Sequence, residues 1–311
     1  MTRIPVFYSD AQVHDAGSFS QSPLKPVMLV RKIALDPGFE INSSLIDSVA
    51  SDRLAQTHDL EHVKALIAGE AKDGFGNASK KNNKAVRATV GNFLAAAEWA
   101  AAGRRTGNPA TDIIHPGVVW SLTSGFHHAG HDFCGGFCTF EALTLAAFEL
   151  HKYRAMKTLI IDEDAHYGNG CENIIWHMGM HEYCQYMQSN HTHCDPGRTS
   201  LTMFEAELEQ KITTFMPNII MYQAGADNWI GDPLGGALTM ERLFLRDKMV
   251  FKLARKYMLP IVVNLAGGYA DNFDDTLAIH MNTGVAMKQV YLNSNDEPVF
   301  PEAALALEEL Q

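Results

Sequence analysis

Short runs of apolar residues along the chain are separated by longer segments in which apolar residues recur at every third or fourth position. The short runs have the length of strands that are buried on both faces, and the longer segments have the period of amphipathic helices. Strands are predicted at residues 3–8, 118–122, 159–161, 182–187, 218–223 and 260–265. Because strands and helices alternate, the pattern predicts an α/β fold with a mostly parallel central sheet and helices on both faces.

Helices are predicted at residues 59–68, 85–102, 137–153, 205–215 and 239–257, with the last helices between 274 and 310. Asn42 or Ser43 has the side chain of a helix cap, so we expect a short helix from there to Ala50. Residues 10–26 are polar and contain glycine and proline, which predicts a loop. The chain of 311 residues shows no repeat or linker, so we expect one domain that spans residues 1–311.

The strand predicted at 159–161 stops abruptly at a group of polar residues. In an extended chain Asp162, Asp164 and His166 share one face, because they are two positions apart. Two carboxylates and an imidazole that converge at a strand end are suitable ligands for a divalent cation. The triplet therefore predicts a metal site.

Three further strands end in residues whose side chains can act in catalysis or metal binding: His127 and His128, Asp227, and Tyr269. In open α/β sheets the ligand crevice lies at the carboxyl ends of the strands. We therefore expect one site that is assembled from four strand ends.

Composition excludes some classes of function. A net charge of −11 at pH 7 argues against a nucleic-acid partner. No apolar run approaches the roughly 20 residues of a membrane helix, and the first ten residues lack the pattern of a secretory signal. Five scattered cysteines without a CxxC pair are typical of reduced thiols, which suggests a cytoplasmic protein. The sequence is compatible with an oligomer.

Four motifs resemble those of the histone deacetylase and acetylpolyamine amidohydrolase superfamily. They are GFHHAGHDFCGGFC (125–138), IIDEDAHYGNG (160–170), AGADNWIGDPLGG (224–236) and AGGY (266–269). A weaker match is THDLEHV (57–63). The resemblance implies an arginase-like fold and zinc-dependent removal of an acyl group from an acylated amine, such as acyl-lysine, an acetylpolyamine or a small metabolite.

Carried over to this sequence, the resemblance implies that Asp164, His166 and Asp227 bind one catalytic Zn²⁺ ion. Three protein ligands leave a position open for water and the substrate carbonyl, as a catalytic site requires. The metal then lowers the pKa of its water and polarises the carbonyl.

The resemblance also implies roles for the residues around the metal. His128 acts as general base and then as general acid, and His127 assists electrostatically with Asp162 as its orienting partner. Asn169 stands where some family members carry an acid, so His128 lacks a countercharge. Tyr269 donates its hydroxyl to the carbonyl oxygen as charge develops there.

Other positions concern the substrate channel and a second ion. Gly136 and Phe137 match a pair that contacts the amide and forms an aromatic wall, and Leu234 is expected near the same channel. Asp195 stands where many relatives have an aromatic wall, which favours a wider or more polar channel. The main-chain carbonyls of Asp162, Asp164 and His166 resemble a site for a structural K⁺ ion, whose remaining ligands the sequence does not reveal.

Two alternatives stay open. A binuclear manganese ureohydrolase of the same fold needs a further carboxylate two residues after Asp227, where this chain has Trp229. A catalytically silent binding protein is the other alternative. Further metal-like spacings are interpreted as surface or packing residues: His58 with His62, His177 with His181, and His191 with His193 and Cys194.

Overall fold

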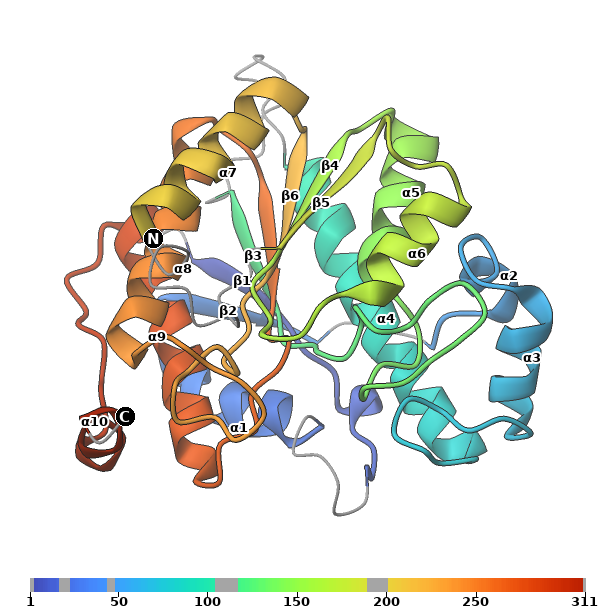
Figure 1. The fold of residues 1–311 in the computed structure, drawn as a ribbon, viewed down its shortest axis with the longest axis horizontal. Helices are drawn as coiled ribbons and strands as arrows, with labels where there is room; N and C mark the ends of the chain where they lie inside the picture. The colour runs from blue at the N-terminus through green and yellow to red at the C-terminus, as the bar shows by residue number, and fades with distance from the viewer. Residues whose placement is uncertain (1–2, 17–22, 44–47, 104–116, 189–200, 310–311) are drawn as a thin grey trace.

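The computed structural model describes residues 3–16, 23–43, 48–103, 117–188 and 201–309 (Figure 1). Within these ranges seven strands form one sheet in the order β2-β1-β3-β7-β6-β4-β5, and every neighbouring pair is parallel. The strands are β1 (Ile4–Phe7), β2 (Phe39–Asn42), β3 (Val118–Ser121), β4 (Thr158–Asp162), β5 (Cys184–Gln188), β6 (Ile219–Gln223) and β7 (Ile261–Asn264). The α/β fold with a parallel sheet is confirmed, and it agrees with an arginase-like architecture.

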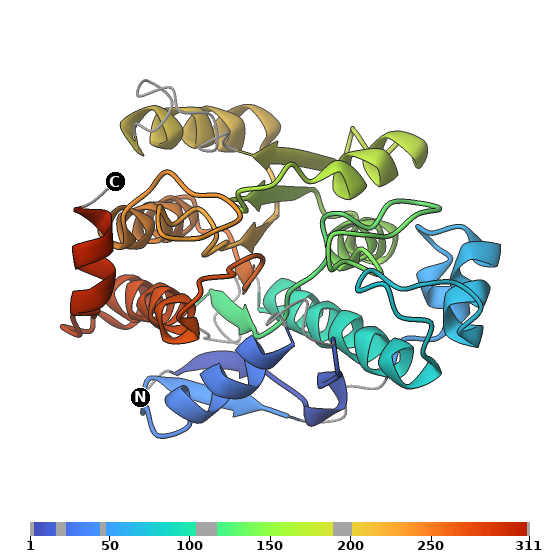
Figure 2. The ribbon, with the colours of Figure 1, turned by 60° about the horizontal axis from the view of Figure 1, so that its bottom comes forward.

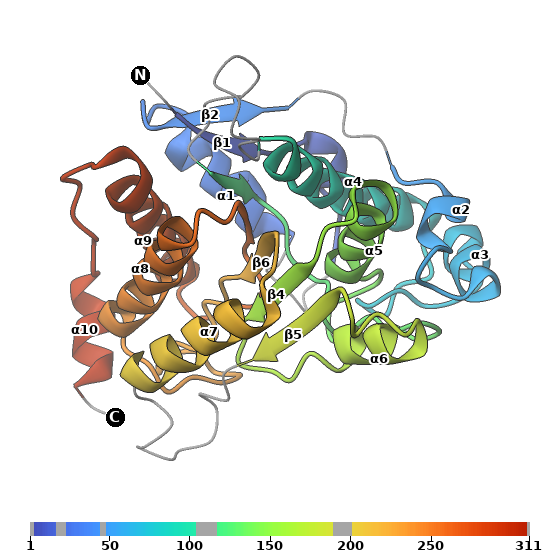
Figure 3. The same cartoon turned by 90° about the horizontal axis from the view of Figure 1, so that it is seen from above.

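Helices cover both faces of the sheet (Figures 1 and 3). One layer contains α2 (Ser51–Leu54), α3 (Leu60–Ala68), α4 (Lys80–Ala102), α5 (Ala142–Arg154) and α6 (Asn169–His177). The other contains α1 (Leu24–Ile33), α7 (Leu201–Phe215), α8 (Met240–Lys256) and α9 (Phe273–Leu292). The short α10 (Glu302–Glu308) lies beside this second layer, and a single 3-10 turn occupies Asp10–Gln12. Figure 2 shows the sheet between the two layers from a second direction. No helix in the described ranges has both the length and the apolar character needed to cross a membrane.

Alternate residues of the central strands enter opposite hydrophobic clusters. In β4, Ile160 packs under α4 and α5, whereas Leu159 and Ile161 face α7 and α8. Each such side chain contributes roughly 1.5–3 kcal/mol when it leaves water. Because both faces are buried, a strand of this sheet appears in the sequence as a continuous apolar run.

The amino-terminal part differs from the prediction. Phe39–Asn42 forms edge strand β2, which pairs with β1, so the short helix expected after Asn42 is wrong. The next helix is Ser51–Leu54, while residues 44–47 lie outside the described part. Pairing with β1 decides the conformation of this segment, and the capping propensity of Asn42 does not. Helix α1 likewise begins at Leu24, inside the predicted loop.

Strand register brings the carboxyl ends of four strands together. Asp162 at the end of β4 lies opposite Gln223 of β6, which lies opposite Asn264 of β7. β3 pairs with the other side of β7. The loops that follow these strands therefore emerge side by side, at the edge where ligands bind in open α/β sheets.

Candidate active site

Two buried carboxylates and a half-buried imidazole meet at the ends of β4 and β6. The candidate ligand atoms of Asp164, His166 and Asp227 all lie within 4.8 Å of one another. Nδ1 of His166 is 3.1 Å from Oδ1 of Asp164 and 3.0 Å from Oδ2 of Asp227. Among the described residues this is the one group of three or more His, Cys, Asp or Glu side chains with metal-binding geometry.

The charges of this triad fit a divalent cation. Burial and the neighbouring carboxylate of Asp164 raise the pKa of Asp227 to about 7. Hydrogen bonds to Asp164 and Asp227 raise the pKa of His166 to about 10. Negative charge raises the pKa of His166 and, together with burial, that of Asp227, and a cation would neutralise this charge. The set of two oxygen ligands and one nitrogen ligand suits zinc with an open coordination position.

Main-chain N–H groups hold the carboxylates in place. Asp164 accepts from the N–H of His166 at 2.9 Å and from the N–H of Gly267 at 2.7 Å. Asp227 accepts from the N–H of Ala165 at 3.2 Å. A Cβ atom at Gly267 would lie 2.2 Å from Oδ2 of Asp227, so this close approach requires glycine. Three strand ends thus fix the triad together.

In an extended chain, Asp162 would share a face with Asp164 and His166. In the structure it does not. Strand β4 ends at Asp162, and the N–H of Asp164 turns back to donate to Oδ1 of Asp162 at 3.0 Å. Oδ2 of Asp162 instead lies 2.8 Å from Nδ1 of His127. The backbone turn therefore separates Asp162 from the triad and directs it to the expected partner, His127.

The tandem histidines occupy different electrostatic environments. Burial alone would lower the pKa of His127, but the carboxylates of Asp164 and Asp162 outweigh it and raise that pKa to about 9. Burial and the charge of His127 lower the pKa of His128. Nδ1 of His128 lies 2.7 Å from Oδ1 of Asn169, and the two histidine rings are 4.0 Å apart. One imidazole thus favours the charged form and the other the neutral form.

Tyr269 lies beside the triad. Its ring centroid is 6.4 Å from that of His166 and 5.6 Å from that of Phe137. Its N–H donates to Oδ2 of Asp232 at 2.6 Å, and the preceding Gly268 has a φ of +140°. Asp232 belongs to the 224–236 motif, so one loop carries a candidate metal ligand, Asp227, and also anchors Tyr269.

Phe137 forms part of an aromatic row. Its ring packs between Phe75, at 5.9 Å, and Tyr269. A Cβ atom at Gly136 would lie 2.5 Å from Cδ2 of His128, so glycine brings the backbone against the general-base candidate. Leu234 is half exposed and follows Asp232 in the same loop. Asp195 lies outside the described residues.

Sequence reasoning missed two buried cations near the triad. Lys25 of α1 is fully buried and donates from Nζ to the carbonyl of Ala266 at 2.5 Å. Arg246 of α8 is also fully buried, and it donates to the carbonyls of Glu163 and Gly225 at 3.2 and 3.0 Å. These carbonyls precede Asp164 and Asp227, so Arg246 links the two loops that carry the candidate ligands.

Each missed cation had a weak signal in the sequence. Lys25 is four residues before Leu29, which faces the core on the same helix. Arg246 stands between Leu243 and Val250 on the apolar face of α8. A charged residue on an apolar helix face indicates a buried partner, but it does not identify that partner.

The other histidine spacings give no second metal cluster in the described ranges. His58 is buried, with Nδ1 2.8 Å from the carbonyl of Gly130, and Nε2 accepts from the N–H of Glu141. His177 stacks on His131, with ring centroids 3.8 Å apart. The cluster at 191–194 lies outside the described residues.

Trp229 occupies the position where a second metal would need a carboxylate. It is buried, and Nε1 donates to Glu308 of α10 at 2.8 Å. An indole offers no metal ligand. The position therefore serves packing against α10.

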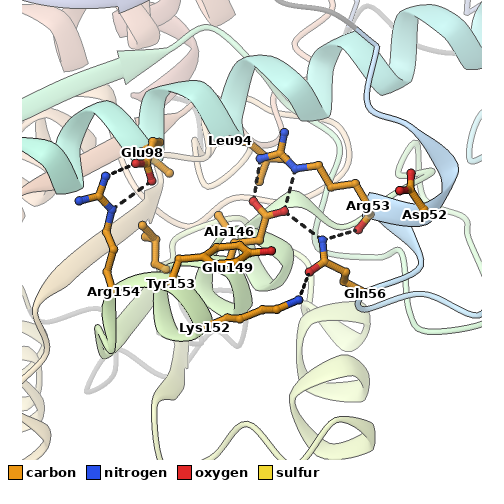
Figure 4. A pocket seen from close by; sticks show the side chains of 12 residues that line it. Asp52, Arg53, Gln56, Leu94, Glu98, Ala146, Glu149, Lys152, Tyr153 and Arg154 are labelled. Atoms are coloured by element: carbon orange, nitrogen blue, oxygen red, sulfur yellow. Dashed lines mark hydrogen bonds and ion pairs between the residues drawn. The ribbon is translucent and has the colours of Figure 1, made fainter.

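A hollow of about 850 Å³ lies between α2, α4 and α5, away from the triad (Figure 4). Four of its charged side chains form two ion pairs: Arg53 with Glu149 at 2.7 Å, and Arg154 with Glu98. Because these charges are satisfied within the wall, the hollow is a weaker candidate for chemistry than the triad.

The chain is similar in sequence to known proteins of one family. The family model "Histone deacetylase domain" matches residues 29–199 and 190–283. Histone deacetylase 2 of Arabidopsis thaliana is 32% identical over 172 residues, which cover 49% of this chain and 44% of the plant protein.

Two further relatives align over most of the chain. Histone deacetylase HDAC1 of Drosophila melanogaster is 24% identical over 305 residues, covering 85% of this chain and 56% of the fly protein. Histone deacetylase clr6 of Schizosaccharomyces pombe is 23% identical over 305 residues, covering 86% of this chain and 73% of that protein. The chain spans about half the length of the plant and fly relatives. Since the domain model matches well over half of its residues, this chain belongs to the histone deacetylase family.

Proposed function

We propose that the protein is a zinc-dependent amidohydrolase that removes an acyl group from an acylated amine. The observation that carries the proposal is the convergence of Asp164, His166 and Asp227 beside His127 and His128. Family membership supports a deacetylase-type hydrolase. A zinc ion held by the three ligands would polarise the substrate carbonyl and lower the pKa of a water molecule.

His128 is the residue best suited to move the proton. The Asn169 side-chain oxygen accepts a hydrogen bond from the N–H of Nδ1, which leaves the lone pair of Nε2 free to accept a proton. The lowered pKa of His128 keeps it neutral and able to accept a proton. It returns this proton to the leaving amine, so His128 acts as base and then as acid.

His127 and Tyr269 stabilise charge. The charged form of His127, held by Asp162, places a positive charge beside Asp164 and the reacting atoms. The Tyr269 hydroxyl is proposed to donate a hydrogen bond to the carbonyl oxygen as it becomes negative.

The aromatic row favours a substrate with an aliphatic stem. Phe75, Phe137 and Tyr269 present ring surfaces beside the triad. Such walls suit the methylene chain of acyl-lysine or of an acylpolyamine, whose apolar surface leaves water on binding.

A panel of acyl-lysine peptides and acylpolyamines tests the proposal, with the parent protein and Asp164→Asn assayed in parallel. We expect hydrolysis by the parent, and loss of both zinc and hydrolysis in the variant. Binding without hydrolysis of any substrate would favour a silent binding protein. A guanidino compound is assayed alongside the panel, and urea release from it that requires manganese would favour the ureohydrolase alternative.

A further inference from the structure

Gln188 contacts two of the three main-chain carbonyls for which the family resemblance implies a potassium ion. It is the last residue of β5 and lies opposite Asp162 in the strand register. Its Nε2 atom is 3.1 Å from the carbonyl oxygen of Asp164 and 2.6 Å from that of His166. A cation that binds both carbonyls would need the volume that this nitrogen fills.

The partners of the amide fix its orientation. Oε1 of Gln188 lies 3.2 Å from the N–H of Gly168, a group that can only donate. Oε1 also lies 3.1 Å from the hydroxyl of Tyr186. The nitrogen therefore faces the two carbonyls, and its two N–H groups match two acceptors.

The neighbouring carboxylate is satisfied without an added cation. Asp162 is fully buried and accepts from the Tyr186 hydroxyl at 2.7 Å and from the N–H of Asp164 at 3.0 Å. His127 is its third partner, at 2.8 Å. Three donors around one carboxylate compensate for its burial.

We propose that the Gln188 amide takes the place of the structural potassium ion in this chain. The amide holds the loop that carries Asp164 and His166, so Gln188 is a positioning residue for the metal centre. An attached amide, unlike a bound ion, stabilises the fold independently of ion concentration. The inference rests on the proposed metal centre, but its tests measure stability and zinc binding and do not use turnover.

Thermal unfolding of the parent protein in different salts tests the inference directly. The zinc-loaded protein is dialysed into KCl, NaCl or choline chloride at one ionic strength. We expect the same unfolding midpoint in all three within about 1 °C, because no potassium binds at this loop. A rise of several degrees that only potassium produces would overturn the inference, whether or not the protein hydrolyses any substrate.

An isosteric variant of Gln188, with a matched control, tests the two side-chain N–H groups of this residue. Gln188→Glu replaces them with a carboxylate that faces two carbonyls, and Gln185→Glu, on the same strand, is the matched control. We expect Gln188→Glu to weaken zinc binding by roughly 10-fold to 100-fold in a chelator competition, the usual effect of removing a group that orients metal ligands. The control should bind zinc as the parent does. Equal zinc affinity in both variants would overturn the inference, and if Gln188→Glu does not fold, the salt comparison on the parent decides.

Discussion

Nζ of Lys25 lies 2.5 Å from the carbonyl oxygen of Ala266, although the two residues are 241 positions apart in the sequence. Ala266 opens the turn that carries Tyr269, and Nζ is also 5.7 Å from the centre of the Tyr269 ring. The amino-terminal helix α1 thus reaches beneath the candidate active site. Burial lowers the pKa of Lys25 to about 8, while the carboxylates of Asp227, Asp164 and Asp232 oppose that shift.

Lys25→Met is expected to loosen the turn at Ala266. The variant keeps most of the side-chain volume but leaves the buried carbonyl without its donor, which costs about 1–3 kcal/mol. We expect a lower free energy of unfolding in urea. We also expect a decrease in kcat that is larger than the change in KM. Lys252→Met, at an exposed position of α8, is the control, and its stability and kcat should match those of the parent. Unchanged stability and kcat for Lys25→Met would show that the contact does not hold the turn.

Arg246→Met should strongly lower the free energy of unfolding. It removes the donor to the Glu163 and Gly225 carbonyls and leaves Asp247 buried beside Tyr222 and Thr283. Removing one member of a buried ion pair costs about 3–5 kcal/mol. Denaturant unfolding measures the loss, and Arg246→Met combined with Asp247→Leu should cost less than the sum of the two single changes. Strict additivity would mean that the pair is not coupled.

Asn169→Asp should move the acid limb of the pH profile of kcat/KM. The substitution puts a carboxylate about where the amide oxygen lies, 2.7 Å from Nδ1 of His128. A negative charge there favours the protonated imidazole and raises the pKa of His128 from its lowered value. Because the neutral form accepts the proton, the acid limb of kcat/KM should shift to higher pH by roughly one unit.

Asn173→Asp, one helical turn further along α6, is the control for this shift. It adds the same charge without contacting His128, so its acid limb should coincide with that of the parent. An unchanged limb in Asn169→Asp would mean that His128 is not the group that titrates.

Tyr269→Phe tests the proposed donor to the carbonyl oxygen. Removing one such hydrogen bond typically lowers turnover by about 100-fold to 1,000-fold. We expect that loss in kcat with little change in KM or zinc content, since the ring and its packing on Phe137 remain. Tyr167→Phe removes an exposed hydroxyl next to His166 and should keep parental turnover. Near-normal turnover in Tyr269→Phe would assign the donor role to another group.

The sequence predicted best the residues that lie in local motifs. Asp164, His166 and Asp227 could be placed together because carboxyl ends of parallel strands share one edge. Lys25, Arg246 and other supporting residues could not, because each contacts a main-chain carbonyl whose position depends on the whole fold. Gln188 lies in a strand that was predicted, yet only the register with Asp162 reveals its role.

Edge strand β2 was missed for a similar reason. Its four residues, Phe39–Asn42, alternate apolar and polar side chains, but the run is short and its conformation depends on pairing with β1. β-structure is set by context more than by residue preference. The same dependence hides the backbone turn after Asp162, which redirects that side chain to His127.

Titration of the metal-free protein with zinc tests most directly whether one metal ion at Asp164, His166 and Asp227 supports deacylation. Metal is removed with a chelator, and the rate of hydrolysis of an acetyl-lysine peptide is followed as zinc is added. We expect no hydrolysis at the start and a linear rise that ends at one zinc per chain. A rate that is independent of zinc, or one that rises until two metal ions are bound, would contradict a single catalytic ion at this site.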